Sequence, residues 1–371
     1  MIISADKIQG SLAKIINDAL RNDKIVIFEK DEYVLDGTVY MPDDSALVLR
    51  DGAVLKAGAH ACDKAGCVAV ITNADKNSGN RNVKISGGVF DGNNAFNHRK
   101  NWKDGPCQGI LFDFVNVDGL HLSNLTAKNS ESYHFRLGFV RNFVIENVTI
   151  SDDLFTPCQD GIHVGGGCRN GVIRNIFAKK GSTNDDLVAF NADDVNYYCQ
   201  NIGMRDADIS DMLVENVTAE DCWTALRLLS VGHRIENVTA DGFNVGVREI
   251  GINCDACRYA TDPLFSDAEY PSGVGNLKNI TLKNFTLWHT TEKDRPLAVL
   301  ETNAENFVIE NFKRKTERDR CPSACTVRAR NMCETHINFN GKESVSGERD
   351  LFVSDADTIE YLYLNRADEK R

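Results

Sequence analysis

Three aspartates whose types and spacing could do chemistry lie in residues 158–194. Asp160 precedes one short apolar strand, and Asp185 and Asp186 precede the next. A chain that coils about once every two dozen residues would place these two strand starts on adjacent turns. Neighbouring parallel strands lie about 4.8 Å apart, and carboxylates held that close raise at least one pKa. Such a group of acids could carry out general acid and base catalysis.

The same pattern has a simpler explanation. Asp and Asn are common turn residues, because their side chains bond the local backbone and tolerate left-handed geometry. An Asp-Asp pair at a strand start is therefore often only a solvent-exposed turn. The interpretation depends on what the rest of the chain places beside these acids.

Composition narrows the class of protein. The 371-residue chain has a formal net charge of −12, a pI near 5.2 and a mean hydropathy of −0.32. This balance is typical of a soluble globular protein and argues against a nucleic-acid or anionic-membrane surface. No stretch approaches the roughly 18 apolar residues of a membrane span, and the first residues lack the features of a signal peptide. We therefore expect a cytoplasmic protein, although a mature secreted form with an added Met would look the same.

Twelve cysteines are scattered along the chain. Without a signal peptide, free thiols are the expected state. One set resembles a zinc pattern, although a long gap divides it: Cys254, Cys257, Cys321, Cys325 and Cys333. We predict no cofactor and no metal, and we leave the zinc alternative and the oligomeric state open.

A repeated phrase runs through the chain from residue 81 on: apolar-x-apolar, x-Asn, apolar-x-apolar. It recurs roughly every 20 to 30 residues, which predicts a solenoid of short strands. Two longer gaps contain inserts, at 192–210 and 253–275. Each Asn between strands is expected to adopt left-handed backbone, and stacked asparagines can form side-chain ladders. The marker asparagines are Asn124, Asn147, Asn175, Asn216, Asn237, Asn284 and Asn311.

This repeat predicts an all-β, single-domain, right-handed parallel β-helix that spans residues 1–371. Apolar residues at helical spacing predict one amphipathic helix over 4–21, within an N-terminal cap of residues 1–24. The β-helix coils are predicted over 25–340, and residues 341–371 would form a C-terminal tail or cap.

The strands that follow each Asn-containing unit are predicted to form a third sheet, which also carries the acids. Aligning these strands by their inward apolar pairs gives an outward column of cationic and hydrogen-bonding side chains. Asp160 and Asp186 share the phase of inward residues, so they can face solvent only if the preceding turn breaks the alternation. The predicted column consists of Arg136, His163, Asn191, Arg227 and Arg248.

These residues resemble those of polygalacturonases, glycoside hydrolase family 28, which have the right-handed parallel β-helix of the pectin-lyase-like superfamily. The family carries the motifs N-T-D, G-D-D, G-H-G and R-I-K on successive turns. This chain has Cys-Gln-Asp160 and Asn-Asp185-Asp186, within the phrases DGIHV and DDLVAF that are similar to the family's DGIDI and DDCIAI. The phrase GGVFDGN at 87–93 is also similar to the start of the family's domain.

Two motifs differ. Trp223-Thr224-Ala225 stands where G-H-G should fall, and Arg248-Glu249-Ile250 stands for R-I-K. In the family that Arg and Lys hold the carboxylate of the sugar, so the missing lysine puts galacturonate specificity in question.

The resemblance implies inverting hydrolysis of a glycosidic bond. By that carry-over Asp185 is the general acid, and Asp160 and Asp186 hold and deprotonate the attacking water. Arg248, Arg227 and His163 would bind the oligosaccharide or polysaccharide, with Arg136 as a further source of charge. An aromatic face for the sugar could come from Trp223, Tyr197 and Tyr198.

Two alternatives stay open. A polysaccharide lyase or epimerase on the same fold would use an Arg or Lys base, often with calcium. A carbohydrate-binding β-helix without activity is favoured by the missing histidine. If the chain is a hydrolase, the inserts at 192–210 and 253–275 would form walls beside the acids, which favours exo-action on oligosaccharide ends.

Overall fold

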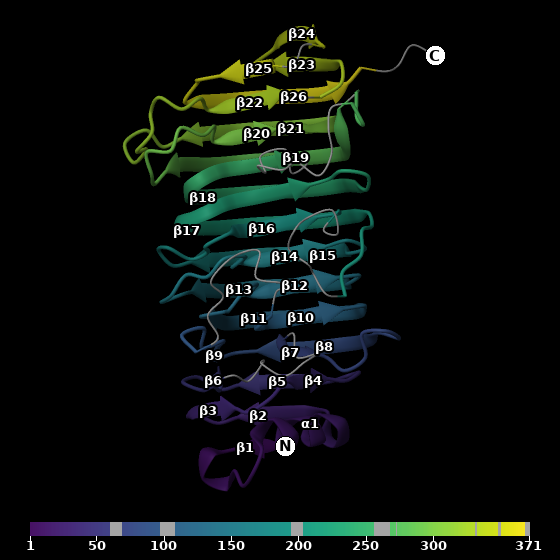
Figure 1. Cartoon of the computed structure of the whole chain (residues 1–371), viewed down its shortest axis with the longest axis vertical. Coiled ribbons are helices and arrows are strands. Elements are labelled where there is room, and N and C mark those ends of the chain that lie inside the picture. Colours follow the sequence, from purple (N-terminus) through teal and green to yellow (C-terminus); the bar gives the residue numbers. More distant parts are fainter. Residues whose placement is uncertain are drawn as a thin grey trace.

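The computed structural model describes residues 1–59, 69–96, 108–193, 203–255, 268–271, 273–330, 332–347 and 350–367. The coils stack into an elongated body with the N-terminus at one end (Figure 1). The predicted fold class is confirmed: the chain is a right-handed parallel β-helix, and its described residues include one α-helix. The described core is continuous along the stack, because one cluster of buried apolar side chains runs from Ile3 to Leu364.

Successive turns pair in parallel and build three faces. The face that matters most here is called the site sheet. It is made by β4 (Val39–Met41), β7 (Ala69–Asn73), β10 (Ile110–Val115), β12 (Phe135–Gly138), β14 (Ile162–Gly165), β16 (Asp186–Asn191), the ends of β17 (Ile209–Leu229) and β18 (Arg234–Asp255), β20 (Ala298–Leu300) and β22 (Val327–Arg330).

The other two faces meet at a bend within long strands. Early turns use separate short strands, namely β1 (Ile2–Ile3), β2 (Ile25–Phe28), β3 (Glu32–Leu35), β5 (Ala46–Leu49), β6 (Val54–Ala57), β8 (Asn80–Ser86) and β9 (Val89–Asp91). Later turns use β11 (Val117–Lys128), β13 (Arg141–Ser151), β15 (Arg169–Ala178), the first parts of β17 and β18, β19 (Val274–His289) and β21 (Thr302–Arg314).

Left-handed asparagines make the bend between those two faces. Asn124, Asn147, Asn175 and Asn216 have φ values of 57°, 55°, 56° and 56°. The side chains of Asn147, Asn175 and Asn216 each donate their amide to the Asn one turn earlier, at 3.0, 2.8 and 3.2 Å. The predicted backbone conformation and the predicted ladder are therefore both confirmed.

One marker was assigned to the wrong column. Asn237 donates to Asp211 at 2.9 Å and accepts from Asn279 at 3.0 Å, so it belongs to a second ladder at the start of the strands. The position above Asn216 is Gly242, which follows Asp241, the partner of Glu215. The residues around Asn237 match the repeated phrase because both ladders place an Asn beside an apolar-x-apolar run.

The two ends of the stack are closed differently. The helix is shorter than predicted: a 3-10 turn, η1, covers Ala5–Lys7, and α1 covers Leu12–Asp23 with Ser11 as its N-cap. Its apolar side packs on the first coil. At the other end β23 (Thr335–Phe339), β24 (Lys342–Ser346), β25 (Asp350–Ser354) and β26 (Thr358–Arg366) pair antiparallel. Within the described residues, no helix has the length and apolar character needed to cross a membrane.

Candidate active site

The structure brings the three predicted acids together on the site sheet. One carboxylate oxygen each of Asp160, Asp185 and Asp186 lies within 4.8 Å of the other two. Asp160 and Asp186 are only 3% exposed, whereas Asp185 is more open to solvent. Gly161 allows the two turns to come this close, because a Cβ at that position would lie 2.4 Å from the carbonyl oxygen of Leu187.

The strand alternation breaks before both strands, as the sequence required. Residues 152–161 contain no strand, so the phase of β14 does not fix the direction of Asp160. In β16, both Leu187 and Val188 belong to the core, so Asp186 is released from the inward phase of Val188. Both acids can therefore join Asp185 outside the core.

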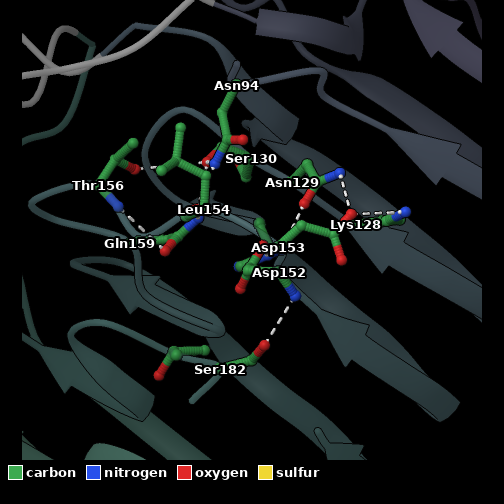
Figure 2. Close-up of polar contacts among 12 residues, drawn as sticks. Asn94, Lys128, Asn129, Ser130, Asp152, Asp153, Leu154, Thr156, Gln159 and Ser182 are labelled. Atoms are coloured by element: carbon green, nitrogen blue, oxygen red, sulfur yellow. Dashed lines mark hydrogen bonds and ion pairs between the residues drawn. The ribbon is translucent and has the colours of Figure 1, made fainter. Parts of the chain in front are cut away.

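A network of polar contacts holds the loop that precedes Asp160 (Figure 2). The side-chain amide of Asn94 donates to the carbonyl oxygens of Leu154 (2.7 Å) and Ser130 (3.1 Å). The amide of Gln159 also donates to Ser130, at 2.8 Å, and Thr156 Oγ1 donates to the Glu131 carbonyl at 2.5 Å. Three successive turns thereby share their loop carbonyls, which fixes the backbone that carries Asp160 without a regular strand.

The same network extends to both neighbouring turns (Figure 2). Lys128 Nζ contacts Asp153 at 2.9 Å, and the Asp152 backbone N–H donates to Ser182 Oγ at 2.7 Å. Ser182 belongs to the loop that leads to Asp185. The loops carrying the two groups of acids are therefore bonded to each other.

Two histidines hold Asp160 from different sides. His134 directs its backbone N–H (2.9 Å) and its ring Nδ1 (2.8 Å) to the Asp160 carbonyl oxygen. Its Nε2 lies 2.9 Å from Asp152 Oδ1, and both side chains are fully buried. His163 Nδ1 lies 2.7 Å from the carboxylate of Asp160, and its ring packs 4.6 Å from the ring of Tyr133.

Arg227 is the guanidinium beside the acids. Its Nη1 lies 3.4 Å from Asp186 Oδ2, and its Nε and Nη2 contact the two oxygens of Asp255 at 3.2 and 3.3 Å. All three side chains are buried. One cation is therefore shared by two carboxylates, which lie on the turns on either side of the turn that carries Arg227.

Burial and mutual repulsion give the acids unusual proton affinities. Burial raises the pKa of Asp160 to about 7, although the hydrogen bond from His163 acts in the opposite direction. Burial, together with the charges of Asp160 and Asp186, holds the pKa of Asp185 well above its ordinary value. Burial also raises the pKa of Asp255 to about 6, against the attraction of Arg227. A raised pKa favours the protonated form of Asp185, which is the form that a general acid needs.

Comparison with known proteins agrees with this geometry. Residues 64–231 match the sequence model of the family described as "Glycosyl hydrolases family 28". A polygalacturonase of Brassica napus is 25% identical over 214 residues, which are 50% of this chain and 51% of that protein. Over these residues the chain is similar to polygalacturonases. It spans about half the length of that curated relative.

Solved structures support the fold of the polygalacturonase-like chain. The polygalacturonase of Erwinia carotovora ssp. carotovora superimposes with a TM-score of 0.53 and 17% identity, covering 89% of this chain and 95% of that chain. The endo-xylogalacturonan hydrolase of Aspergillus tubingensis gives a TM-score of 0.53 and 16% identity, covering 89% and 91%. At these identities the likeness concerns the β-helix alone.

Arg136 lies level with His163 as predicted, whereas Asn191 and Arg248 do not lie in that column. Arg136 is fully buried, and its Nε donates to the buried Asp113 at 2.8 Å, so it does not line the acid cluster. The position level with His163 is Ala189, not Asn191, which pairs one step further along with Gly165. The outward position between the inward Val188 and Phe190 is Ala189, so Asn191 was placed two residues too far along.

Arg248 was also placed in the wrong register. The residue level with Arg227 is Asn253. Arg248 instead donates from Nη2 to the carbonyl oxygens of Thr183 and, at 3.3 Å, Gly181, in the loop before Asp185. The register shifts between Ala219 and Thr224 account for the displacement.

A cluster of aromatic and cationic side chains adjoins that loop. The backbone N–H of Trp223 donates to the Thr183 carbonyl at 3.1 Å. The Trp223 ring lies 4.3 Å from Lys293 Nζ and 5.7 Å from the Arg248 guanidinium. Phe155, which is 41% exposed, lies 5.5 Å from the same guanidinium. We call these four residues the aromatic-cationic cluster.

Sequence reasoning missed several of these residues. His134, Asp152 and Asp255 carry no motif, because each finds its partner only through stacking of distant turns. Lys293 follows a long strand in a polar segment and gives no local signal. Tyr197 and Tyr198, predicted as part of the aromatic face, lie outside the described residues.

The cysteines and the acids were the candidates for metal ligands. Seven described cysteines form no disulfide, and Cys254 is fully buried in the core. Cys257 lies outside the described residues. In the described part of the chain, the three acids are the group whose ligand atoms come close enough to share a cation. An acidic cluster alone does not make a metal site, and the guanidinium of Arg227 already neutralises part of this charge.

Proposed function

We propose that this chain hydrolyses glycosidic bonds in uronate-containing, pectin-type saccharides. The observation that carries the proposal is the group of three clustered carboxylates with three different environments. Asp185 is partly open to solvent and its pKa is held well above the ordinary value, Asp186 is buried beside Arg227, and Asp160 is buried beside His163. The first can donate a proton to a leaving oxygen, and the other two can hold and deprotonate a water.

The spacing of the acids fits a shared water. Two oxygens that both accept from one water, at about 2.8 Å each and a tetrahedral angle, lie about 4.6 Å apart. The carboxylate oxygens of Asp160 and Asp186 lie within 4.8 Å of each other. The glycosidic bond to be cut would then lie between that water and the carboxyl group of Asp185. Asp185 is the most accessible of the three acids.

The aromatic-cationic cluster supports an acidic sugar as the substrate. An indole face packs against the apolar side of a sugar ring, and the ammonium of Lys293 can pair with a uronate. Burial, together with the charges of Arg295 and Arg248, lowers the pKa of Lys293. Glu249 already contacts the Lys293 ammonium, and an additional anion would relieve the remaining repulsion. Lys293 would thereby supply the positive charge of the lysine in R-I-K, whose place is taken by Ile250 in this chain.

Inversion and exo-action are finer parts of the proposal. An attacking water opposite the general acid would invert the anomeric carbon. For exo-action, the support is that the described end of the first insert lies on the site sheet. Met204 packs against Gly138, Arg205 lies 4.3 Å from the Phe139 ring, and the Ala207 N–H donates to Ala192. The central parts of both inserts, 194–202 and 256–267, lie outside the described residues.

Lyase chemistry is disfavoured by the state of Arg227. A lyase needs a basic side chain that can take a proton from the sugar, and Arg227 is held by Asp186 and Asp255. A binding module without activity would have no use for three acids held together at a cost in repulsion.

The test is incubation of the purified chain with polygalacturonate, short oligogalacturonides and neutral oligosaccharides. Reducing ends, near-ultraviolet absorbance and product sizes are followed over time, and proton NMR identifies the first anomer formed. We expect reducing ends without unsaturated products, inverted anomers and one small unit released from chain ends. An unsaturated product would indicate a lyase, mid-length fragments would indicate internal cutting, and no product at all would leave a binding protein.

A further inference from the structure

Asp160 is in an environment that opposes its ionisation. It is buried, and Asp185 and Asp186 lie within 4.8 Å of its carboxylate. Arg227 contacts Asp186 and Asp255. An uncompensated carboxylate in such a place would keep its proton, and a protonated Asp160 could not accept one from water.

The compensating contact comes from His163. Its Nδ1 lies 2.7 Å from Asp160 Oδ2, and both side chains are buried. An ionised carboxylate can only accept a hydrogen bond, so Nδ1 must donate whenever Asp160 is ionised. Tyr133 packs on the imidazole ring at 4.6 Å, and β-sheet pairing fixes His163 between Arg136 and Ala189. The donor is therefore held in place from three sides.

We propose that His163 is a positioning residue that keeps Asp160 ionised and aimed at the attacking water. Only the kinetic consequence of this role depends on the proposed hydrolysis. His163 was predicted to bind substrate, whereas its contacts direct it to the acid. The hydrogen bond from His163 is charge-assisted when Asp160 is ionised and weaker when Asp160 is protonated, so it favours the ionised form.

His134 provides an internal contrast. It donates to the backbone carbonyl of Asp160, whose hydrogen-bonding capacity does not change when the carboxyl group titrates. His134 therefore fixes the loop, and His163 sets the proton affinity of the acid. The other charged groups around this point are Asp185, Asp186, Arg227, Asp255, Arg136 and Asp152.

The kinetic test is the pH dependence of kcat/KM in His163→Leu and His163→Asn. Leu removes the donor, so we expect the acidic limb to move to higher pH, with about a tenfold loss on that side for each pH unit of displacement. Asn retains an N–H near the position of Nδ1, so its limb should lie closer to that of the wild type. The matched control is His121→Leu, at an exposed histidine paired with Glu146, which should leave the limb in place. An equal loss for His163→Leu at every pH would overturn the proposal.

A second measurement does not depend on turnover. Nitrogen-15 NMR of the histidine-labelled resting protein, with His163 assigned from His163→Leu, shows which ring nitrogen carries the proton. Above pH 7, where Asp160 is ionised, we expect a protonated Nδ1 in the wild type and a changed Nδ1 signal in Asp160→Asn. A proton on Nε2 alone would overturn the positioning role. If the expected NMR signals are found but no saccharide is cut, the proposed function fails and the His163–Asp160 contact stands.

Discussion

Two polar stacks run along this β-helix, and they have opposite consequences. At the bend between the long faces, asparagines from four successive turns bond one another at 2.8–3.2 Å. On the site sheet, carboxylates from two adjacent turns lie within 4.8 Å of one another. The fold stacks like residues in both places. An amide both donates and accepts, so the ladder satisfies itself, whereas a carboxylate only accepts.

The difference shows where this fold can place chemistry. Regular stacking serves neutral side chains, and apolar rings use it as well: Phe112 and Phe135 stack at 4.9 Å, and Phe243 and Phe285 at 4.4 Å. Groups that carry the same charge repel one another, so they can be stacked only where oppositely charged or hydrogen-bonding side chains from other turns lie beside them. Arg227, His163 and the bonded loops of Figure 2 supply these contacts around the acids.

The largest expected effect comes from replacing Asp185, the proposed general acid. Asp185→Asn keeps the shape of the side chain but cannot donate a proton to the leaving oxygen. We expect hydrolysis to fall by about 10²–10⁴-fold, with an unchanged circular-dichroism spectrum. The matched control is Asp241→Asn, because Asp241 accepts from Asn284 in the ladder and Asn can take that place. Comparable activity in both variants would mean that the acid cluster is not the active site.

The next effect is on pH dependence. Asp160 must be ionised to accept a proton, and its pKa is raised to about 7, so kcat/KM should fall about tenfold per pH unit below that value. Asp185 must stay protonated, and its pKa is raised well above the ordinary value, so activity should fall again only at higher pH. A pH series on a short oligogalacturonide measures both limbs. A maximum near pH 4, where unperturbed carboxyls titrate, would show that the acids ionise independently.

The two stacks also differ in how far the sequence predicted them. The ladder was predictable because Asn124, Asn147 and Asn175 occur at the same place in a repeated phrase, and an Asn at that place indicates a left-handed bend. Asp160 and Asp185 were predictable as neighbours because they open strands one turn apart. Local sequence does not encode the break in alternation at Leu187 and Val188, which releases Asp186 from the inward phase of Val188.

Partners from distant turns were beyond local reasoning. Arg136 looked like a substrate ligand because nothing near it in sequence shows that Asp113, on another turn, binds it. Arg248 and Asp255 depend on register shifts in β17 that cannot be counted from residue types. The sequence therefore predicts the coil and its acids, and only tertiary stacking decides which cations meet them.

A smaller effect is expected in substrate binding. Lys293→Met keeps an unbranched stem on Trp223 but removes the charge, so KM for oligogalacturonides should rise about tenfold, as one desolvated ion pair would predict. The kcat value should change little. Lys315→Met is the control, because Lys315 lies 5.3 Å from the ring of Trp288 in a similar pair. An equal KM change for both lysines would remove Lys293 from the binding site.

The smallest effect on activity, and the clearest on stability, is expected in the ladder. Asn175 has a φ of 56°, donates to Asn147 and accepts from Asn216. Asn175→Ala loses both hydrogen bonds and strains the left-handed backbone, so the free energy of unfolding should fall by about 1–3 kcal/mol. Asn175→Gly loses the same bonds but accepts the backbone, and should fall less. Urea unfolding measures both variants, and kcat/KM should stay at the wild-type value. If the ladder variant instead lowered activity as strongly as Asp185→Asn, the two stacks would be mechanically coupled and the separation between scaffold and chemistry would be wrong.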